Sequence, residues 1–293
     1  MTYEQFVQAV EYKVKGGVRQ GVCVSIHTAR KYNGVDRKGI LFSEEKSSLS
    51  PAIYLEEYYQ RFQKGDSLDA IVKEILKIYR RMRFRKPWKP EMIKEYNAVG
   101  ERIVYRLINR RQNRALLKSM PFVPYLDLAV VFYVLLESDA CGMAAMPVTT
   151  EHLEVWSTTE KDIYERARRN TRILLPASFQ TMSEAIKQLT GEEQKKDLVA
   201  DRVYVLSNCL RSFGASAVLY PGLLESISRK VGDGYFVLPS SVHEVLIVPR
   251  SEAYGKDILD RMVAEINEEQ VIPEEALSDQ SYYYDRILRK LSM

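Results

Sequence analysis

The sequence contains few cysteines and few histidines, and it has no long apolar run. Three cysteines, Cys23, Cys141 and Cys209, are spread over 293 residues without CxxC spacing, which favours reduced thiols over a disulfide framework. The longest apolar run covers the nine residues 128–136, whereas a membrane-spanning helix needs about 20. The first residues include acidic side chains and no apolar stretch, so we expect no signal peptide. These absences predict a soluble protein of the cytoplasm.

Motifs that bind nucleotides or metal ions are also absent. No Walker sequence is present, and no GxGxxG follows an apolar strand. The three histidines, His27, His152 and His243, are far apart in the sequence, and only His27 has a cysteine near it, Cys23 four residues earlier. Because metal sites formed by local motifs show short ligand spacings, we expect no metal ion and no cofactor.

The composition is that of a folded globular protein with a substantial core. Hydrophobic residues make up 46% and charged residues 28% of the chain, which argues against low-complexity disorder. A chain of this length forms one large domain or two of ordinary size. The segment RFRKPWKP, residues 83–90, has two prolines and four positive charges and is typical of an exposed connector. We therefore predict an N-terminal part, residues 1–88, and a larger C-terminal part, residues 89–293, which could pack as one body.

Hydrophobic periodicity and turn signals predict an α+β fold. In the first part we expect a helix, a hairpin and two helices: helix 2–14, strands 21–30 and 38–42 joined by Asn33-Gly34, a helix from Ser50-Pro51 to Gly65, and a helix over 66–82.

In the second part strands and helices again alternate. We expect strands at 102–109, 127–136, 142–148, 203–206, 215–219, 235–238 and 245–248, with helices opening at Ser157, Thr181 and Gly222 and after Tyr254. Residues 282–284 are ambiguous between helix and strand. Pairs of strands followed by a helix recur, so the prediction is a mainly antiparallel sheet built from strand-strand-helix units and covered by helices.

Positive charge is concentrated in one part of the chain. Residues 79–118 contain 13 Lys and Arg but only three acids, whereas the whole chain has a net charge of +4. Cations neutralise phosphates or carboxylates, and interleaved aromatic rings can stack on bases. The alternative is a solvated connector and helix face. The candidate binding residues are Arg80, Arg81, Arg83, Arg85, Lys86, Trp88, Lys89, Arg110, Arg111 and Arg114.

A short polar insert separates two apolar runs near the end of the chain. Residues 239–244, Pro-Ser-Ser-Val-His-Glu, lie between the expected strands 235–238 and 245–248. The candidate catalytic residues are Ser240, Ser241, His243 and Glu244, as nucleophile and acid–base groups. Neither GxSxG nor HExxH is present, and adjacent residues of an extended chain point to opposite faces. The alternative is a structural turn whose serines cap backbone amides.

Several phrases resemble a bacterial domain-of-unknown-function family. They are KYNGVDRKGILF (31–42), SPAIYLEEYY (50–59), NTRILLPASF (170–179), LPSSVHEVLIVP (238–249) and NEEQVIPEEALSDQSYYYDR (267–286). Over about residues 124–249 the chain more distantly resembles the YtpQ-like uncharacterised proteins. In those proteins we expect an Arg-Asp pair at the positions of His243 and Glu244, which weakens a catalytic interpretation. The resemblance implies a soluble bacterial protein and supplies no activity.

Three functions remain open from the sequence. The first is a non-enzymatic binding or adaptor protein that takes an anionic partner, nucleic acid or acidic protein, through residues 80–114. The second is a hydrolase-like enzyme that uses the polar insert. The third is a structural subunit of a larger assembly.

Overall fold

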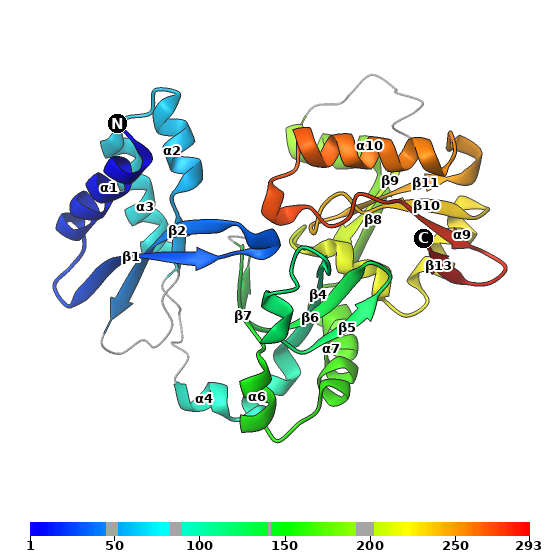
Figure 1. The fold of residues 1–293 in the computed structure, drawn as a ribbon, viewed down its shortest axis with the longest axis horizontal. Coiled ribbons are helices and arrows are strands. Elements are labelled where there is room, and N and C mark those ends of the chain that lie inside the picture. Colours follow the sequence, from blue (N-terminus) through cyan, green and yellow to red (C-terminus); the bar gives the residue numbers. More distant parts are fainter. Residues whose placement is uncertain (45–51, 83–89, 140–141, 192–201) are drawn as a thin grey trace. The chain divides into compact units, whose positions relative to one another are not determined.

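The computed structural model describes residues 1–44, 52–82, 90–139, 142–191 and 202–293. Within these residues the fold is α+β, with three antiparallel sheets and helices (Figure 1). The chain divides into two compact units, residues 1–98 and 99–293. The predicted boundary at residue 88 lies outside the described residues.

The first unit combines one three-stranded sheet with helices. Its sheet has the strand order β1-β2-β3, and all neighbours are antiparallel. Its elements are α1 (Tyr3–Gly17), β1 (Val22–Arg30), the 3-10 turn η1 (Tyr32–Gly34), β2 (Asp36–Glu44), β3 (Ala52–Tyr54), α2 (Glu56–Gln63), α3 (Leu68–Met82), α4 (Pro90–Lys94) and α5 (Tyr96–Val99), the last of which reaches the unit boundary.

The hairpin between β1 and β2 forms where the Asn-Gly pair predicts it. Asn33 has φ 57° and Gly34 has φ 74°, the left-handed conformation that Asn and Gly tolerate best. Val22 pairs with Glu44 at one end of the ladder and Arg30 with Asp36 at the other. The turn thus sets the register that places alternate apolar side chains of both strands on one face.

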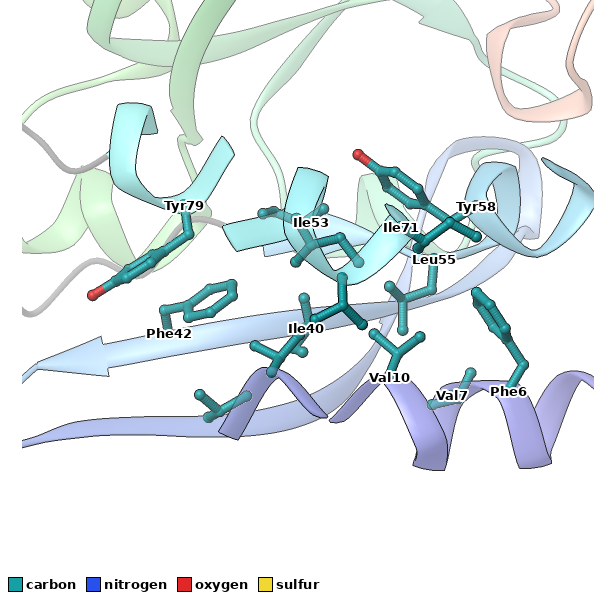
Figure 2. Packing of buried hydrophobic residues seen from close by; sticks show 14 residues of the cluster. Phe6, Val7, Val10, Ile40, Phe42, Ile53, Leu55, Tyr58, Ile71 and Tyr79 are labelled. Carbon is teal, nitrogen blue, oxygen red and sulfur yellow. The ribbon is translucent and has the colours of Figure 1, made fainter. Parts of the chain in front are cut away.

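The core of the first unit lies between the sheet and its helices (Figure 2). The ring of Phe42 on β2 stacks on Tyr79 of α3, with centroids 4.1 Å apart. The buried side chains shared by α1, the strands and α3 include Phe6, Val10, Val14, Ile40, Phe42, Ile53, Leu55, Ile71 and Ile75. Their spacing in α1 and α3 is the helical periodicity on which the two helix predictions rest.

The helix predicted to start at Ser50-Pro51 is wrong in its first turn. Residues 52–54 form strand β3, which pairs with β2, and the helix α2 begins only at Glu56. Ile53 of this strand is buried in the core. Pairing with β2 and burial of Ile53 outweigh the local capping signal, because tertiary packing overrides local propensity. Ser50 and Pro51 lie outside the described residues.

The second unit contains a four-stranded and a six-stranded sheet. The smaller one has the order β4-β6-β5, with β7 also paired to β6, and the larger one has the order β13-β12-β10-β11-β9-β8. The strands are β4 (Ile103–Asn109), β5 (Phe122–Tyr125), β6 (Leu128–Asp139), β7 (Gly142–Pro147), β8 (Ala177–Thr181), β9 (Tyr204–Asn208), β10 (Tyr235–Leu238), β11 (Val245–Pro249), β12 (Tyr282–Asp285) and β13 (Lys290–Ser292).

Helices pack against both sheets of this unit. The helices are α6 (Thr150–Val155), α7 (Glu160–Leu174), α8 (Met182–Thr190), α9 (Leu223–Val231) and α10 (Lys256–Glu269), with short 3-10 segments η2 (Gly100–Arg102), η3 (Leu116–Lys118), η4 (Gly214–Leu219), η5 (Arg250–Glu252) and η6 (Pro273–Glu275). On α7, buried Thr171 accepts a hydrogen bond from the amide of Tyr105 on β4. On α10, Leu259 and Val263 pack with Leu238 and Val248 of the larger sheet.

Two local predictions for this unit are wrong, and one that the sequence left open is settled. Residues 215–219 form the 3-10 segment η4 and not a strand, since Ala215, Ala217 and Val218 are all buried instead of alternating. The helix after Trp156 is capped by Thr159 and Asp162, two residues later than the predicted Ser157 box. The ambiguous residues 282–284 are in strand β12. Because 203–219 is therefore no strand pair, the predicted series of strand-strand-helix units is not present as expected.

In the described residues no helix has both the length and the apolar character needed to cross a lipid bilayer.

Candidate functional site

The polar insert forms the loop that connects the antiparallel strands β10 and β11. Leu238 pairs with Leu246 at the end of this ladder, so the residues between them make the connection. The insert is not a regular strand: Val242 and His243 form a bend that Glu244 follows, and Ser241 makes an isolated bridge with Ala276. Strand alternation therefore does not decide where the side chains of the insert point.

His243 is held through both of its ring nitrogens. Its Nδ1 accepts a hydrogen bond from the amide of Phe213 at 3.2 Å, and its Nε2 lies 3.1 Å from Oε1 of Glu275. An imidazole nitrogen that accepts carries no proton, so the proton of neutral His243 lies on Nε2 and is donated to Glu275. The partner carboxylate is thus Glu275 of η6, and not the adjacent Glu244.

The serines of the insert do not contact this imidazole. The Ser241 hydroxyl accepts a hydrogen bond from the amide of His243 at 3.1 Å, a local turn of the kind that Ser favours. Within the part of the chain that the structure describes, neither Ser240 nor Ser241 bonds the ring, and Glu244 has no side-chain partner. A base for serine activation needs a free ring nitrogen within hydrogen-bonding reach. The structure does not assemble that arrangement.

The insert is instead tied to a segment that follows much later in the sequence. The amide of Val242 donates to the carbonyl of Glu275 at 2.9 Å, and Leu277 and Ser278 donate to Ser240 and Pro239 at 3.2 and 3.0 Å. These residues belong to two of the phrases that carry the family resemblance, 238–249 and 267–286. The backbone polar groups of both segments are satisfied by each other, so the two phrases form one structural module.

A strained turn lies against the same insert. Arg211 and Phe213 have φ of 48° and 54°, which side chains other than glycine seldom adopt. Fully buried Asn208 organises the turn, because its Oδ1 accepts from the amides of Leu210 and Ser212 and its Nδ2 donates to the carbonyl of Ser212. Such strain persists only where the surrounding structure enforces it.

Gly214 allows the strained turn and the insert to approach closely. A Cβ at this position would lie 2.5 Å from the amide nitrogen of Asn208 and 2.7 Å from the carbonyl oxygen of His243. The hydroxyl of Ser207 donates to that same carbonyl at 2.7 Å. Glycine is therefore required here for space and not for a positive φ.

Arg106 packs in the interior of this region, a role that the sequence does not predict. Its guanidinium carbon lies 4.0 Å from the ring centroid of Tyr133 and 3.8 Å from that of Phe213, a cation held between two rings. The residue is only 7% exposed. The signal in the sequence is a single cation inside the apolar strand IVYRLIN. Arg106 therefore contributes to the packing of the second unit and not to an exposed basic surface.

The arginine loop, residues 110–118, displays the other cations of this region. Arg110, Arg111, Arg114 and Lys118 are exposed, and among the described residues their side chains form no ion pair. The loop backbone is fixed by two asparagines: Asn109 accepts from the amide of Gln112 at 2.9 Å, and buried Asn113 donates to the carbonyl of Asn109 at 2.7 Å. A rigid turn thus presents four unneutralised cations.

The base of this loop is anchored by polar contacts to the 277–282 segment. Asn109 donates to the carbonyl of Leu277 at 3.0 Å, and the carboxylate of Asp127 accepts from the hydroxyls of Ser278 and Tyr282. Burial, and then the nearby Asp127 carboxylate, raise the pKa of Tyr282 above its ordinary value. These bonds hold the loop, the β5–β6 turn and the late segment together.

The remaining candidate cations belong to the first unit or to undescribed residues. Arg80 and Arg81 are in the last turn of α3, where positive charge complements the helix dipole. Arg83, Arg85, Lys86, Trp88 and Lys89 lie outside the described residues. Arg80 and Arg81 thus belong to a different unit from the arginine loop, and the arginine loop is the part of the basic run that the second unit presents.

The protein is thus an α+β protein whose second unit contains a His243–Glu275 pair and a buried arginine, Arg106. The described residues contain no group of three or more His, Cys, Asp or Glu side chains arranged to bind a metal ion. The sequence matches the family described as Family of unknown function (DUF5688) over residues 3–286, and the chain belongs to that family. This agrees with the predicted membership of a family of unknown function. No curated protein and no solved structure matches the chain.

Proposed function

We propose that the protein is a non-enzymatic binding or adaptor protein that takes an anionic partner at the arginine loop. The observation that carries this proposal is the set of four exposed cations on a turn held by Asn109 and Asn113. Ion pairs would lower the capacity of these cations to bind an anion, and among the described residues they have none.

Physical chemistry supports a polyanion as the partner. Arginine presents several donors in a planar fork that matches phosphate and carboxylate groups. A turn that is already ordered loses little conformational entropy when it binds, so its contacts contribute more to affinity. A cluster of like charges also accelerates encounter with an oppositely charged partner.

Binding across a salt series tests the proposal. Single-stranded RNA, double-stranded DNA and a poly-glutamate peptide are titrated separately, with fluorescence anisotropy as the readout. For a nucleic-acid partner we expect the triple variant Arg110→Gln, Arg111→Gln, Arg114→Gln to reduce affinity roughly tenfold or more. The slope of log K against log salt should fall by up to about three, since each lost phosphate contact removes roughly one released counterion. Preference for the peptide would identify an acidic protein as the partner.

A matched control separates this loop from charge in general. Arg168→Gln, Arg169→Gln, Arg172→Gln removes the same charge from the exposed face of α7, where Arg168 and Arg169 already face Glu165 and Glu101. We expect this control to retain most of the affinity. Equal losses in both triple variants, or no salt-sensitive binding of any of the three anions, would contradict the proposal.

A hydrolase-like activity at Ser240, Ser241, His243 and Glu244 is the alternative. The imidazole–carboxylate pair of His243 and Glu275 is the observation that favours it, because a carboxylate commonly orients a catalytic imidazole. It requires the amide of Phe213 to release Nδ1. Hydrolysis of a panel of activated esters that is lost in both Ser241→Ala and His243→Asn would support the alternative over the binding function.

Further proposals concern the setting of the protein. A cytoplasmic location is supported by the free thiols of Cys23 and Cys209. Bacterial origin is supported by the resemblance of the phrases quoted above to a bacterial family, and a distant likeness to YtpQ-like proteins over residues 124–249 stays a proposal. A role as a structural subunit would appear as a stable larger complex in light scattering of native extracts.

A further inference from the structure

The hairpin tip, residues 286–289 between β12 and β13, exposes two aliphatic side chains. Ile287 is 91% exposed and has the highest exposed fraction among the large hydrophobic side chains of the described residues, and Leu288 is 73% exposed. In Figure 1 this hairpin is the red loop beside the label β13, and its turn extends away from the rest of the six-stranded sheet. A protruding apolar tip can insert into an apolar environment outside the protein, whereas it cannot enclose a small ligand as a pocket does.

The turn is built to hold these side chains outward. The carboxylate of Asp285 accepts hydrogen bonds from the amides of both Ile287 and Leu288, at 2.7 and 2.8 Å. Arg289 takes φ 50°, a conformation in which Gly or Asn is usual. The sequence thus places apolar and basic residues where turn chemistry favours small polar ones, and such departures from local preference are expected at functional positions.

Positive charge surrounds the tip. Arg286 donates to the carbonyl of Gly232, which joins the hairpin to the carboxyl-terminal end of α9. The acids nearby are used within the molecule: Asp285 caps the turn, Glu225 faces Arg229 and Arg289, and Asp233 accepts from the following amide. The exposed cations around the tip are Arg229, Arg286, Arg289 and Lys290.

We propose that this hairpin tip inserts into the surface of a bilayer that contains anionic phospholipid. The aliphatic pair enters the interface between headgroups and acyl chains, while the surrounding cations contact the anionic headgroups. The tip shares no residue with the arginine loop, so the proposal stands independently of the anionic partner proposed there.

Vesicle sedimentation with the full chain tests this proposal. The vesicles contain phosphatidylcholine and phosphatidylserine at about 7:3, with pure phosphatidylcholine vesicles as the uncharged comparison. We expect binding to the mixed vesicles to fall roughly tenfold or more in Ile287→Ser, Leu288→Ser, because two aliphatic side chains lose their transfer free energy. Lys290→Gln should weaken binding to the mixed vesicles and leave the uncharged comparison unchanged.

The matched control exchanges the same two residue types elsewhere on the second unit. Ile173→Ser, Leu189→Ser removes side chains that are 63% and 74% exposed on α7 and α8, and we expect vesicle binding to be retained. A direct readout is Ile287→Trp, whose emission should shift to the blue on addition of mixed vesicles and be quenched by brominated lipid.

Three results would overturn the proposal. They are no binding of the unaltered chain to mixed vesicles, equal losses in the two serine variants, and tryptophan emission that vesicles do not change. A change in self-association with unchanged vesicle binding in the Ile287→Ser, Leu288→Ser variant would show that the tip contacts another protein chain instead.

Discussion

The guanidinium carbon of Arg106 lies 3.8 Å from the ring centroid of Phe213. Phe213 belongs to a strained turn more than a hundred residues later in the chain. On its other side is Tyr133 of β6. Because β4 and β6 belong to the smaller sheet and Phe213 follows β9 of the larger one, this cation joins the two sheets of the second unit.

Replacing Arg106 with lysine tests this role. We expect Arg106→Lys to lower the free energy of unfolding by about 1–2 kcal/mol, since an ammonium cannot stack flat between two rings. Urea denaturation gives the measurement. Arg168→Lys is the control, on an exposed face of α7, and should change the free energy by less than about 0.5 kcal/mol. Equal losses of unfolding free energy in Arg106→Lys and Arg168→Lys would show that stacking between the two rings does not require a guanidinium.

Gly214 should tolerate no side chain. We expect Gly214→Ala to lower the free energy of unfolding by more than about 2 kcal/mol, because the added Cβ meets backbone atoms that cannot move away. In Gly16→Ala of α1, the new Cβ meets nothing within 4 Å, so stability should rise by about 0.5–1 kcal/mol. Thermal unfolding of both variants measures this, and an unchanged Gly214→Ala would contradict the close approach.

Partly buried Tyr125 and buried Tyr282 predict that the stability of the fold falls at high pH. Burial raises the pKa of Tyr125 to about 12, and burial with Asp127 raises that of Tyr282 as well. A raised folded pKa means that folding favours the neutral phenol, so this stability is fully present below the unfolded pKa of about 10. It is then lost as the pH rises from about 10 towards the higher folded value.

Tyr282→Phe removes both the hydrogen bond of the Tyr282 hydroxyl and its ionisation at high pH, and the two effects can be measured at different pH values. At neutral pH we expect it to cost about 1–3 kcal/mol, because the hydrogen bond to the Asp127 carboxylate is lost. Above a pH of about 10 the variant should lose stability less steeply than the unaltered chain. Denaturation at several pH values measures both effects. Tyr254→Phe, at an exposed position, should change neither the stability at neutral pH nor its pH dependence. If stability fell equally steeply above a pH of about 10 in Tyr282→Phe and in the unaltered chain, ionisation of Tyr282 would not be the cause.

Asn113 tests whether order in the arginine loop matters for binding. Asn113→Ala removes the bond to the carbonyl of Asn109 without changing charge. We expect weaker binding of the anion, by roughly threefold to tenfold, because a loose loop must be ordered on binding. The salt slope should stay unchanged, since the number of cations is the same. Affinity equal to that of the unaltered chain would mean that the loop geometry does not contribute.

Local signals in the sequence predict the local structure well. The Asn33-Gly34 pair predicts the first hairpin, and the two apolar runs around residues 239–244 predict β10 and β11, because each depends on neighbouring residues alone. Residues 52–54 and 214–219 are predicted wrongly because their structure depends on distant partners. The first pairs with β2, and the second is enclosed on all sides by the second unit.

The partner of His243 could not be read from the sequence for the same reason. Glu275 reaches the imidazole only because residues 275–278 return to pair with the insert. The adjacent Glu244 is the closer carboxylate in sequence, yet it is not the partner. Arg106 shows the converse: the residue was counted in the basic run, whereas the structure buries it between two rings.

The pairing of residues 239–242 with 275–278, and of β10 with β12, has a consequence for synthesis on the ribosome. The chain emerges amino end first, so β10 and β11 are released before the segment that completes them. Until then, one edge of β10 is open and can pair with a neighbouring nascent chain. The edge of β10 that pairs with β12 is therefore covered only after β12 has emerged.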